Sequence, residues 1–142
     1  MLSGFCDRFR PLALTLLRLA LGVIFLWHGW GKLSGLGHWT QNFVPKGFPP
    51  YFAYLAGGLE TVGGGLLILG LFGRVAGLLL AGELLIALVK VHLPGGPIWN
   101  VGRYELVMLL SAASFVIFAY GSGPWSLDAR VRVRRGAVRR AA

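Results

Sequence analysis

The stretch YFAYLAGGLETVGGGLLILGLFGRVAGLLLAGELLIALVKV, residues 51–91, decides the fold of this chain. It holds two apolar runs, 51–72 and 75–91, which are separated only by Gly73 and Arg74. A helix needs about 20 residues to cross a hydrocarbon layer about 30 Å thick, and a segment in lipid must satisfy its own backbone hydrogen bonds. The stretch therefore predicts two antiparallel membrane-spanning helices joined by a tight turn.

The remainder of the chain has the same character. The runs 12–30 and 104–120 predict a first and a fourth span. Hydrophobic residues make up 56% of the 142 residues and charged residues only 13%, about half the charged fraction of soluble domains. This composition disfavours a water-soluble enzyme, and the single cysteine excludes a disulfide-rich secreted module. We expect an all-α, integral membrane four-helix bundle with antiparallel up-down topology.

The basic residues predict how the chain lies in the membrane. One side of the predicted bundle holds Arg8, Arg10, Arg74 and six arginines of the tail, and the other holds Lys32, Lys46, Lys90 and Arg103. Lys and Arg favour the cytoplasmic side, so nine against four predicts a multi-pass protein of the cell membrane with both termini in the cytoplasm. We divide the chain into a cytoplasmic segment 1–11, a four-span domain 12–120 and a basic tail 121–142. The tail predicts contact with anionic lipid or an acidic soluble partner, and no nucleic acid.

The ionisable residues of the spans sort by depth. Counting about 1.5 Å per residue from the cytoplasmic end places Arg18, Glu60 and Glu83 in the middle of the membrane. The outer group comprises His28, Lys32, Lys90, His92, Arg103 and Glu105. A charge at the bilayer centre costs at least about 2.5–3.5 kcal/mol, so we expect the central group to face the interior of the bundle.

Helical spacing indicates which faces pack together, because residues that recur at this spacing share one face. The first span places Arg18, Gly22, Phe25, Gly29 and Lys32 on one face, the second forms a ridge of Ala53, Gly57, Thr61 and Gly65, and the third puts Glu83 and Lys90 on one face. A ridge of small residues lets a neighbouring helix approach closely.

The interior charges have two interpretations. Arg18, Glu83 and Lys90 are candidates for an interior ion pair, in which Arg18 pairs with Glu83 or Glu60 and fixes the register of the helices. Alternatively, one glutamate takes up and releases protons in a cavity.

The histidines also have two interpretations. His28 and His92 lie at one level, where neutral imidazoles either hydrogen-bond a quinone carbonyl and move protons, or anchor the helices at the membrane surface. Three histidines and one cysteine show no ligand spacing, so we expect no metal site.

A set of motifs resembles the DoxX family of small four-span membrane proteins. They are Arg18, then Leu21-Gly-Val-Ile-Phe-Leu-Trp-His28-Gly29, Lys32-Leu33, Ala56-Gly-Gly-Leu-Glu60, Lys90-Val-His92-Leu-Pro, Tyr104-Glu105 and Gly121-Ser-Gly123-Pro-Trp-Ser126-Leu-Asp128. The resemblance implies a four-helix bundle in the plasma membrane, associated with oxidoreductase systems such as thiosulfate:quinone oxidoreductases and complexes that respond to thiol or superoxide stress.

Two functions follow. The first is an integral membrane subunit of an oxidoreductase complex with no covalently bound cofactor. It either holds a quinone-like ligand between the helices or docks a soluble redox partner that supplies the redox cofactor. In this function His28, Glu60, Glu105 and His92 handle protons and carbonyl contacts, while Arg18 and Glu83 form a polar floor. The second is a non-enzymatic membrane module, either an assembly or stabilising subunit or a small transporter, acting with a protein partner or as a homo-oligomer.

Overall fold

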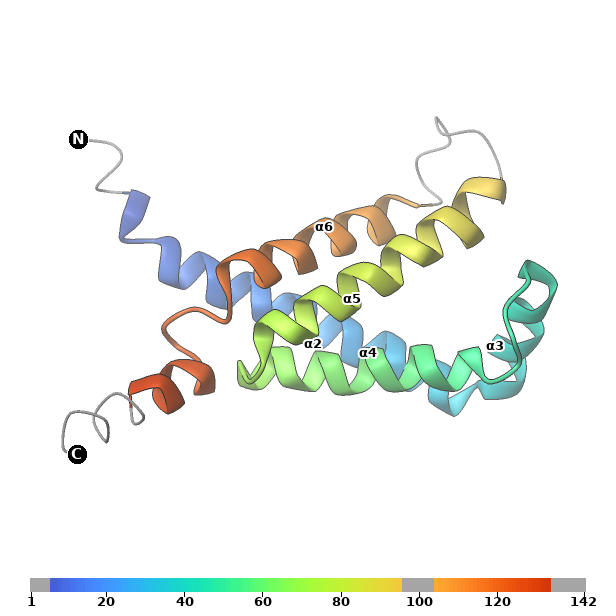
Figure 1. Ribbon diagram of the computed structural model, residues 1–142, viewed down its shortest axis with the longest axis horizontal. Helices are drawn as coiled ribbons and strands as arrows, with labels where there is room; N and C mark the ends of the chain where they lie inside the picture. The colour runs from blue at the N-terminus through green and yellow to red at the C-terminus, as the bar shows by residue number, and fades with distance from the viewer. Residues whose placement is uncertain (1–5, 96–103, 134–142) are drawn as a thin grey trace.

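The computed structural model describes residues 6–95 and 104–133, and this part of the chain is helical, with no β-strand (Figure 1). Its elements are α2 (Arg10–Ser34), α3 (Leu36–Phe43), the 3-10 turn η1 (Val44–Lys46), α4 (Phe52–Leu69), α5 (Gly73–Ala87), the π-helical turn η2 (Leu88–His92), the 3-10 turn η3 (Leu93–Gly95) and α6 (Glu105–Tyr120). Residues 127–133 are also helical. The prediction of an all-α protein is confirmed for the described residues.

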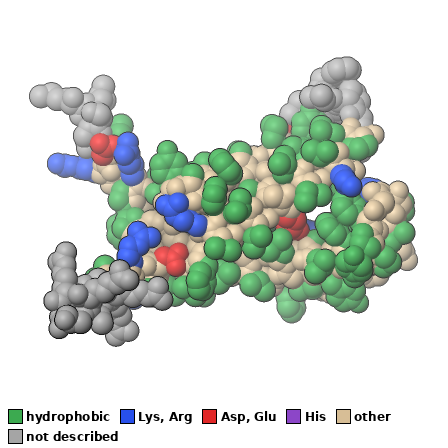
Figure 2. Space-filling model, in the orientation of Figure 1, with side chains coloured by type: hydrophobic (Ala, Val, Ile, Leu, Met, Phe, Trp, Pro, Cys, Tyr) green, Lys and Arg blue, Asp and Glu red, His purple; other side chains and the backbone are tan. Residues whose placement is uncertain are grey.

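Each of the four predicted apolar runs forms a helix. Three segments, Arg10–Ser34, Phe52–Leu69 and Gly73–His92, are long and apolar enough to cross a membrane. The fourth, α6, is an apolar helix of 16 residues. Hydrophobic side chains cover the length of the helices, as expected for surfaces that contact lipid (Figure 2). The structure thus has the helices of a membrane protein.

The tight turn between α4 and α5 lies earlier than predicted. α4 ends at Leu69 because Gly70 adopts a left-handed conformation with φ 68°, which glycine reaches without steric strain. Phe72 is also left-handed, with φ 51°, and α5 begins at Gly73. Gly73 and Arg74 therefore belong to α5, and the link is formed by residues 70–72.

α2 and α4 lie side by side and cross at glycines (Figure 1). A methyl group added at Gly22 would lie 2.8 Å from the carbonyl oxygen of Gly64, and one added at Gly64 would lie 2.6 Å from the backbone nitrogen of Leu26. The prediction for the first helix is confirmed, since Arg18, Gly22, Phe25, Gly29 and Lys32 are all buried.

The ridge predicted on α4 is partly wrong. Gly57 and Thr61 pack closely against a neighbouring helix as predicted, at Gly29 of α2, but a methyl group at Gly65 would meet nothing within 4 Å. Gly64, one residue earlier, makes the close contact instead. A repeat of four residues exceeds the 3.6 residues of a helical turn, so it drifts off the interface over the length of α4.

α5 and α6 form the second close pair (Figure 1). A methyl group at Gly77 would lie 2.8 Å from the carbonyl oxygen of Ser114 and from the amide nitrogen of Phe118. The core that joins the two pairs consists of Leu21, Phe25, Leu67, Ala76, Leu80, Leu84, Leu110 and Ile117. The start of α2 and residues 127–133 lie at one end of the molecule, and α3 and η2 lie at the other (Figure 1).

Candidate functional site

The candidate site is a cavity of about 590 Å³ at the end of the molecule that carries α3 and η2. Its polar lining comprises His28, Lys32, His38, Asn42, Lys46, Glu60, Glu83 and His92, and its aromatic lining comprises Phe25, Trp39, Phe43 and Phe52. Cavities of this size, mostly apolar with a few polar groups, are typical of small-molecule sites.

Lys32 and Glu60 form a buried ion pair on one wall of the cavity. The Lys32 ammonium group donates a hydrogen bond to Glu60 Oε2, and the two side chains are 11% and 5% exposed. The contact follows from the glycine crossing, because Gly29 rests on Gly57 and Thr61, and helical side chains lean toward the N terminus of their helix. Lys32 therefore leans back along α2 and reaches Glu60 on α4.

Glu83 lies on α5 beside this pair and also lines the cavity. Its Oε2 atom is buried and has no hydrogen-bond partner within residues 6–95 and 104–133. Leu80 of α5 packs against Gly63 of α4, which sets the register that brings Glu83 to the level of Glu60. Glu83 therefore has a buried carboxylate oxygen with which a bound molecule can pair.

His28 and His92 both line the cavity, as the sequence predicted for residues at one level. The Nδ1 of His92 is 3.0 Å from the carbonyl oxygen of Ala87. Because a carbonyl only accepts, Nδ1 carries the proton and donates this bond. In the neutral ring, Nε2 is then an acceptor available to a ligand.

Lys90 does not share the face of Glu83, contrary to prediction. The chain between them enters the π-helical turn η2, whose i→i+5 pairing changes the rotation per residue. Lys90 is exposed, and its ammonium group lies 6.0 Å from the centre of the Phe48 ring. The interior pairing predicted for Lys90 is therefore wrong.

Glu105 also lies outside the cavity. It occupies the first position of α6 and is exposed, while Leu106 and Val107, which follow it, line the cavity. Its carboxylate instead complements the positive end of the helix dipole. Arg103, placed in the same outer group, lies outside the described residues.

The cover of the cavity is the element that sequence reasoning missed. Residues 31–50 lie between the predicted spans 12–30 and 51–72, and within them residues 36–43 form α3, which contributes His38, Trp39 and Asn42 to the lining. Asn42 Nδ2 lies 3.0 Å from both Nε2 and the carbonyl oxygen of His38. The spacing of four between His38 and Asn42, and between Trp39 and Phe43, is the helical signal that the sequence offered.

An aromatic cluster holds α3 against the start of α4. Phe43 lies 5.6 Å from Phe52 and 5.7 Å from Trp39 between ring centres, and Phe48 stacks on Phe52 at 4.3 Å. The Lys32 ammonium group lies 5.2 Å from the centre of the Trp39 ring. The cover and the buried ion pair are thus in direct contact.

Arg18 does not pair with Glu83 or Glu60, which corrects the predicted ion pair and polar floor. Its Nη2 donates to the carbonyl oxygen of Trp125 at 2.9 Å, and its Nη1 donates to that of Ile68 at 3.4 Å. Arg18 lies at the level of Gly70, where α4 ends, whereas Glu83 is ten residues into α5, about 15 Å away along the helix. Counting depth from the end of each apolar run missed this because α2 extends about eight residues, or about 12 Å, past the level of Gly70.

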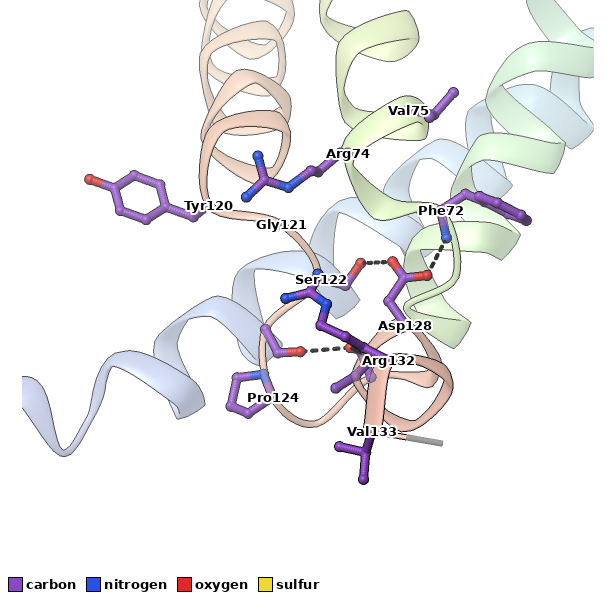
Figure 3. Close-up of a pocket in the computed structure, with 13 residues that line it drawn as sticks. Phe72, Arg74, Val75, Tyr120, Gly121, Ser122, Pro124, Asp128, Arg132 and Val133 are labelled. Atoms are coloured by element: carbon purple, nitrogen blue, oxygen red, sulfur yellow. Dashed lines mark hydrogen bonds between the residues drawn. The ribbon is translucent and has the colours of Figure 1, made fainter. Parts of the chain in front are cut away.

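A second cavity, of about 550 Å³, lies at the opposite end and centres on Asp128 (Figure 3). The carboxylate accepts hydrogen bonds from Ser122 Oγ at 2.7 Å, the Phe72 amide at 2.9 Å and the Gly73 amide at 3.1 Å. Burial raises the pKa of Asp128, but these bonds and the nearby Arg132 outweigh burial and hold the pKa below its usual range. Asp128 therefore fastens the segment after α6 to the turn between α4 and α5.

No cluster of three or more His, Cys, Asp or Glu side chains suited to a metal ion occurs in the described ranges. The polar groups that line the site include three imidazoles, the buried Glu83 Oε2 and the Lys32–Glu60 ion pair, all at the edge of an apolar core.

Comparison with known proteins places this chain in a family. The DoxX family model matches residues 13–93. The chain is 34% identical over 97 residues to a Bacillus subtilis protein named "Putative oxidoreductase CatD", which covers 68% of this chain and 72% of the relative. It is 34% identical over 143 residues to an uncharacterized membrane protein of Mycobacterium tuberculosis, covering 87% and 84%.

A more distant relative is the inner membrane protein YqjF of Escherichia coli, which is 25% identical over 111 residues, covering 78% of this chain and 85% of the relative. No solved structure matches. The matched residues 13–93 include α2, α4 and α5, which carry His28, Lys32, Glu60 and Glu83, so the site lies largely within the family domain. The chain is a membrane protein of the DoxX family, as its motifs indicated.

Proposed function

We propose that this protein is a multi-pass subunit of an oxidoreductase complex in the cell membrane, and that its cavity binds the head group of a quinone-like molecule. The observation that carries the proposal is the lining of the cavity, in which a carboxylate oxygen that has no partner among the described residues lies among imidazoles and aromatic rings. The name of the Bacillus subtilis relative, "Putative oxidoreductase CatD", supports the class of reaction.

The residues of the cavity fit a flat molecule with a carbonyl or hydroxyl at each edge. His28, His92 and Glu83 offer hydrogen-bonding atoms, and Trp39, Phe43 and Phe52 offer flat apolar surfaces. A bound quinone would supply two-electron redox chemistry. The protein would contribute position, hydrogen bonds and protons, because an imidazole gains and loses a proton near neutral pH.

The Lys32–Glu60 pair stabilises this arrangement. The positive ammonium group beside the cavity would favour negative charge on a bound ring, while Glu60 supplies its counter-charge in an apolar surrounding. Electrons would come from a soluble redox partner, since the side chains described hold no redox centre of their own.

The proposed topology is a four-helix bundle with both termini in the cytoplasm. The described ends of the chain lie at one end of the molecule (Figure 1), together with Arg8, Arg10 and Arg74, as the distribution of positive residues requires. Cys6, the only cysteine, is exposed. A maleimide that does not cross membranes should therefore label Cys6 in inverted vesicles and not in intact cells, and labelling of intact cells would reverse the topology.

Binding can be tested with the whole chain in lipid nanodiscs and a quinone that lacks a tail. We expect saturable quenching of tryptophan fluorescence that Trp39→Phe removes, because Trp39 lines the cavity. The matched control is Trp27→Phe, since Trp27 is 79% exposed on the outer face of α2 and should keep the saturable component. Quenching that rises linearly in all three proteins, with no saturable part, would refute a quinone site.

The second candidate function is that of a stabilising subunit without a ligand. The Lys32–Glu60 pair and the Arg18 hydrogen bonds favour it, because both are formed within the chain and need no bound molecule. Glu83→Gln separates the two functions when the variant is isolated with its native partner. A redox subunit should assemble normally and lose turnover per assembled complex. A stabilising subunit should lose complex or thermal stability and keep the turnover of each complex that forms.

A further inference from the structure

We infer that the ligand of the polar cavity carries an alkyl tail, which leaves the cavity between α4 and α5 and lies in an apolar groove on the lipid-facing surface. This inference rests on the proposed function and extends it from the head group to the tail. The groove has a volume of about 450 Å³ and is lined by Leu55, Ala56, Leu59, Leu78, Leu79 and Ile86, with Gly82 on its floor.

The groove and the polar cavity are continuous. Phe52 and Glu83 line both of them, so both side chains lie at the junction. The polar cavity, on one side of this junction, is lined by imidazoles and an ion pair. In the groove, on the other side, Glu83 is the polar side chain among the described residues that line it. A single molecule that occupies both spaces must have a polar head and an apolar tail.

The junction opens toward lipid. Figure 2 shows acidic side-chain atoms on the surface between α5 and α4, surrounded by hydrophobic side chains. Of the two glutamates at this level, Glu60 is 4% exposed, whereas Glu83 is partly exposed. Glu83 thus lies at a lipid-facing opening, and its buried Oε2 has no hydrogen-bond partner in the described part of the chain, which is costly unless a bound polar group satisfies it.

The α4–α5 seam is close at one level and open at another. Near the turn that joins the two helices, a methyl group at Gly63 of α4 would lie 3.0 Å from the Leu80 side chain of α5. Toward the polar cavity, the groove opens between the two helices, and a methyl group at Gly82 would meet nothing within 4 Å. The seam therefore has room at the level where it meets the polar cavity.

The test is to fill the groove and compare two ligands. Gly82→Leu places a side chain on the groove floor, and the matched control Gly65→Leu adds the same side chain to α4, at a glycine that also faces open space. Each protein in nanodiscs is titrated with a quinone without a tail and with the same ring carrying a ten-carbon tail, using the quenching component assigned to Trp39.

Adding side-chain atoms to a space that a ligand must fill reduces the binding constant by about fivefold to over a hundredfold. We therefore expect Gly82→Leu to weaken binding of the tailed quinone about tenfold or more and to leave binding of the tailless quinone within about twofold. Gly65→Leu should change neither. Equal affinities of Gly82→Leu and the unchanged chain for the tailed quinone would overturn the inference alone, whereas no saturable binding of either quinone would overturn the proposed function as well.

Photolabelling gives a second measurement that does not depend on a variant. A quinone with a diazirine at the end of its tail should label Leu78, Leu79 or Ile86 in preference to Val23 and Trp27, which are exposed on α2, away from the groove. Label spread evenly over the lipid-facing residues would contradict a tail held in the groove.

Discussion

Lys32 of α2 donates a hydrogen bond to Glu60 of α4, and this pair is the buried ion pair among the described residues. The pair lies beside the contact of Gly29 with Gly57 and Thr61, which fixes the two helices relative to each other. Its ammonium group also lies against Trp39 of the aromatic cover formed by α3. The pair therefore connects the packing of the bundle to the polar cavity, and its removal should report on both.

Breaking the pair from one side should be more harmful than removing it entirely. Glu60→Gln leaves the Lys32 ammonium group buried without its counter-charge, and loss of one partner of a buried pair costs about 3–5 kcal/mol. Replacing both, as Lys32→Met with Glu60→Leu, should recover most of the loss. A double-mutant cycle of equilibrium unfolding in detergent measures this, and additive effects would show that the two groups do not interact.

The glycine crossing should tolerate no added methyl group. Gly29→Ala would push against Thr61 and the Gly57 carbonyl, and we expect the free energy of unfolding to fall by about 1–3 kcal/mol. The control is Gly65→Ala, which faces open space and should stabilise the helix by about 0.5–1 kcal/mol. The same unfolding assay compares them, and a neutral Gly29→Ala would mean that α2 and α4 lie farther apart.

Arg18 should connect three parts of the chain through its planar guanidinium group. Its two hydrogen bonds reach Ile68 at the end of α4 and Trp125 beyond α6. Arg18→Lys keeps the charge but cannot donate to both carbonyl oxygens as the planar guanidinium does. We therefore expect the free energy of unfolding to fall by about 1 kcal/mol or more, and to fall further in Arg18→Gln. The emission of Trp125, measured in a variant without other tryptophans, should shift as its segment loosens, and an unchanged spectrum would argue against this contact.

Asp128 should make the attachment of the segment after α6 sensitive to acid. Its pKa is lower in the folded than in the unfolded chain, so its stabilising effect is complete above the unfolded value of about 4. The effect is lost as pH falls through the folded pKa, because a protonated carboxyl accepts fewer hydrogen bonds. Thermal unfolding followed from pH 6 to pH 3 should show this loss as a fall in the unfolding temperature. Asp128→Asn should unfold at a lower temperature at pH 6, and its unfolding temperature should change less between pH 6 and pH 3.

A control for this titration is Asp7→Asn, since Asp7 is an exposed carboxylate paired only with Arg10 of its own helical segment. An exposed pair of this kind contributes little. If the acid sensitivity survives in Asp128→Asn and disappears in Asp7→Asn, then Asp7 and not Asp128 causes it, and the prediction is wrong.

Hydrophobicity and helical period determined the helices from the sequence. The inward face of α2 from Arg18 to Lys32 was predicted because lipid leaves no other place for these side chains. Glu60 and Glu83 were predicted in a central group and His28 and His92 in an outer group, whereas the structure brings all four to one cavity.

The partners of these side chains depended on the register between helices, which the sequence does not contain. Whether Arg18 meets Glu83 or the end of α4 depends on the levels at which the helices begin and end, and this was set by the Gly70 turn and by the extension of α2 past the level of that turn. The two alternatives differ by about 15 Å along the bundle, nearly three helical turns. The π-helical turn that moves Lys90 away from Glu83 likewise leaves no mark in the hydrophobic pattern.

The sequence by itself thus determined that this is a membrane protein of apolar helices with a few charged residues directed inward. The reason is that the free energy of placing a charge in lipid is large and depends on local composition. The tertiary structure alone decided that Lys32 neutralises Glu60 and that Glu83 keeps a free oxygen beside an open seam. These outcomes follow from contacts between residues far apart in the chain, where close packing at glycines fixes positions to within an ångström or so.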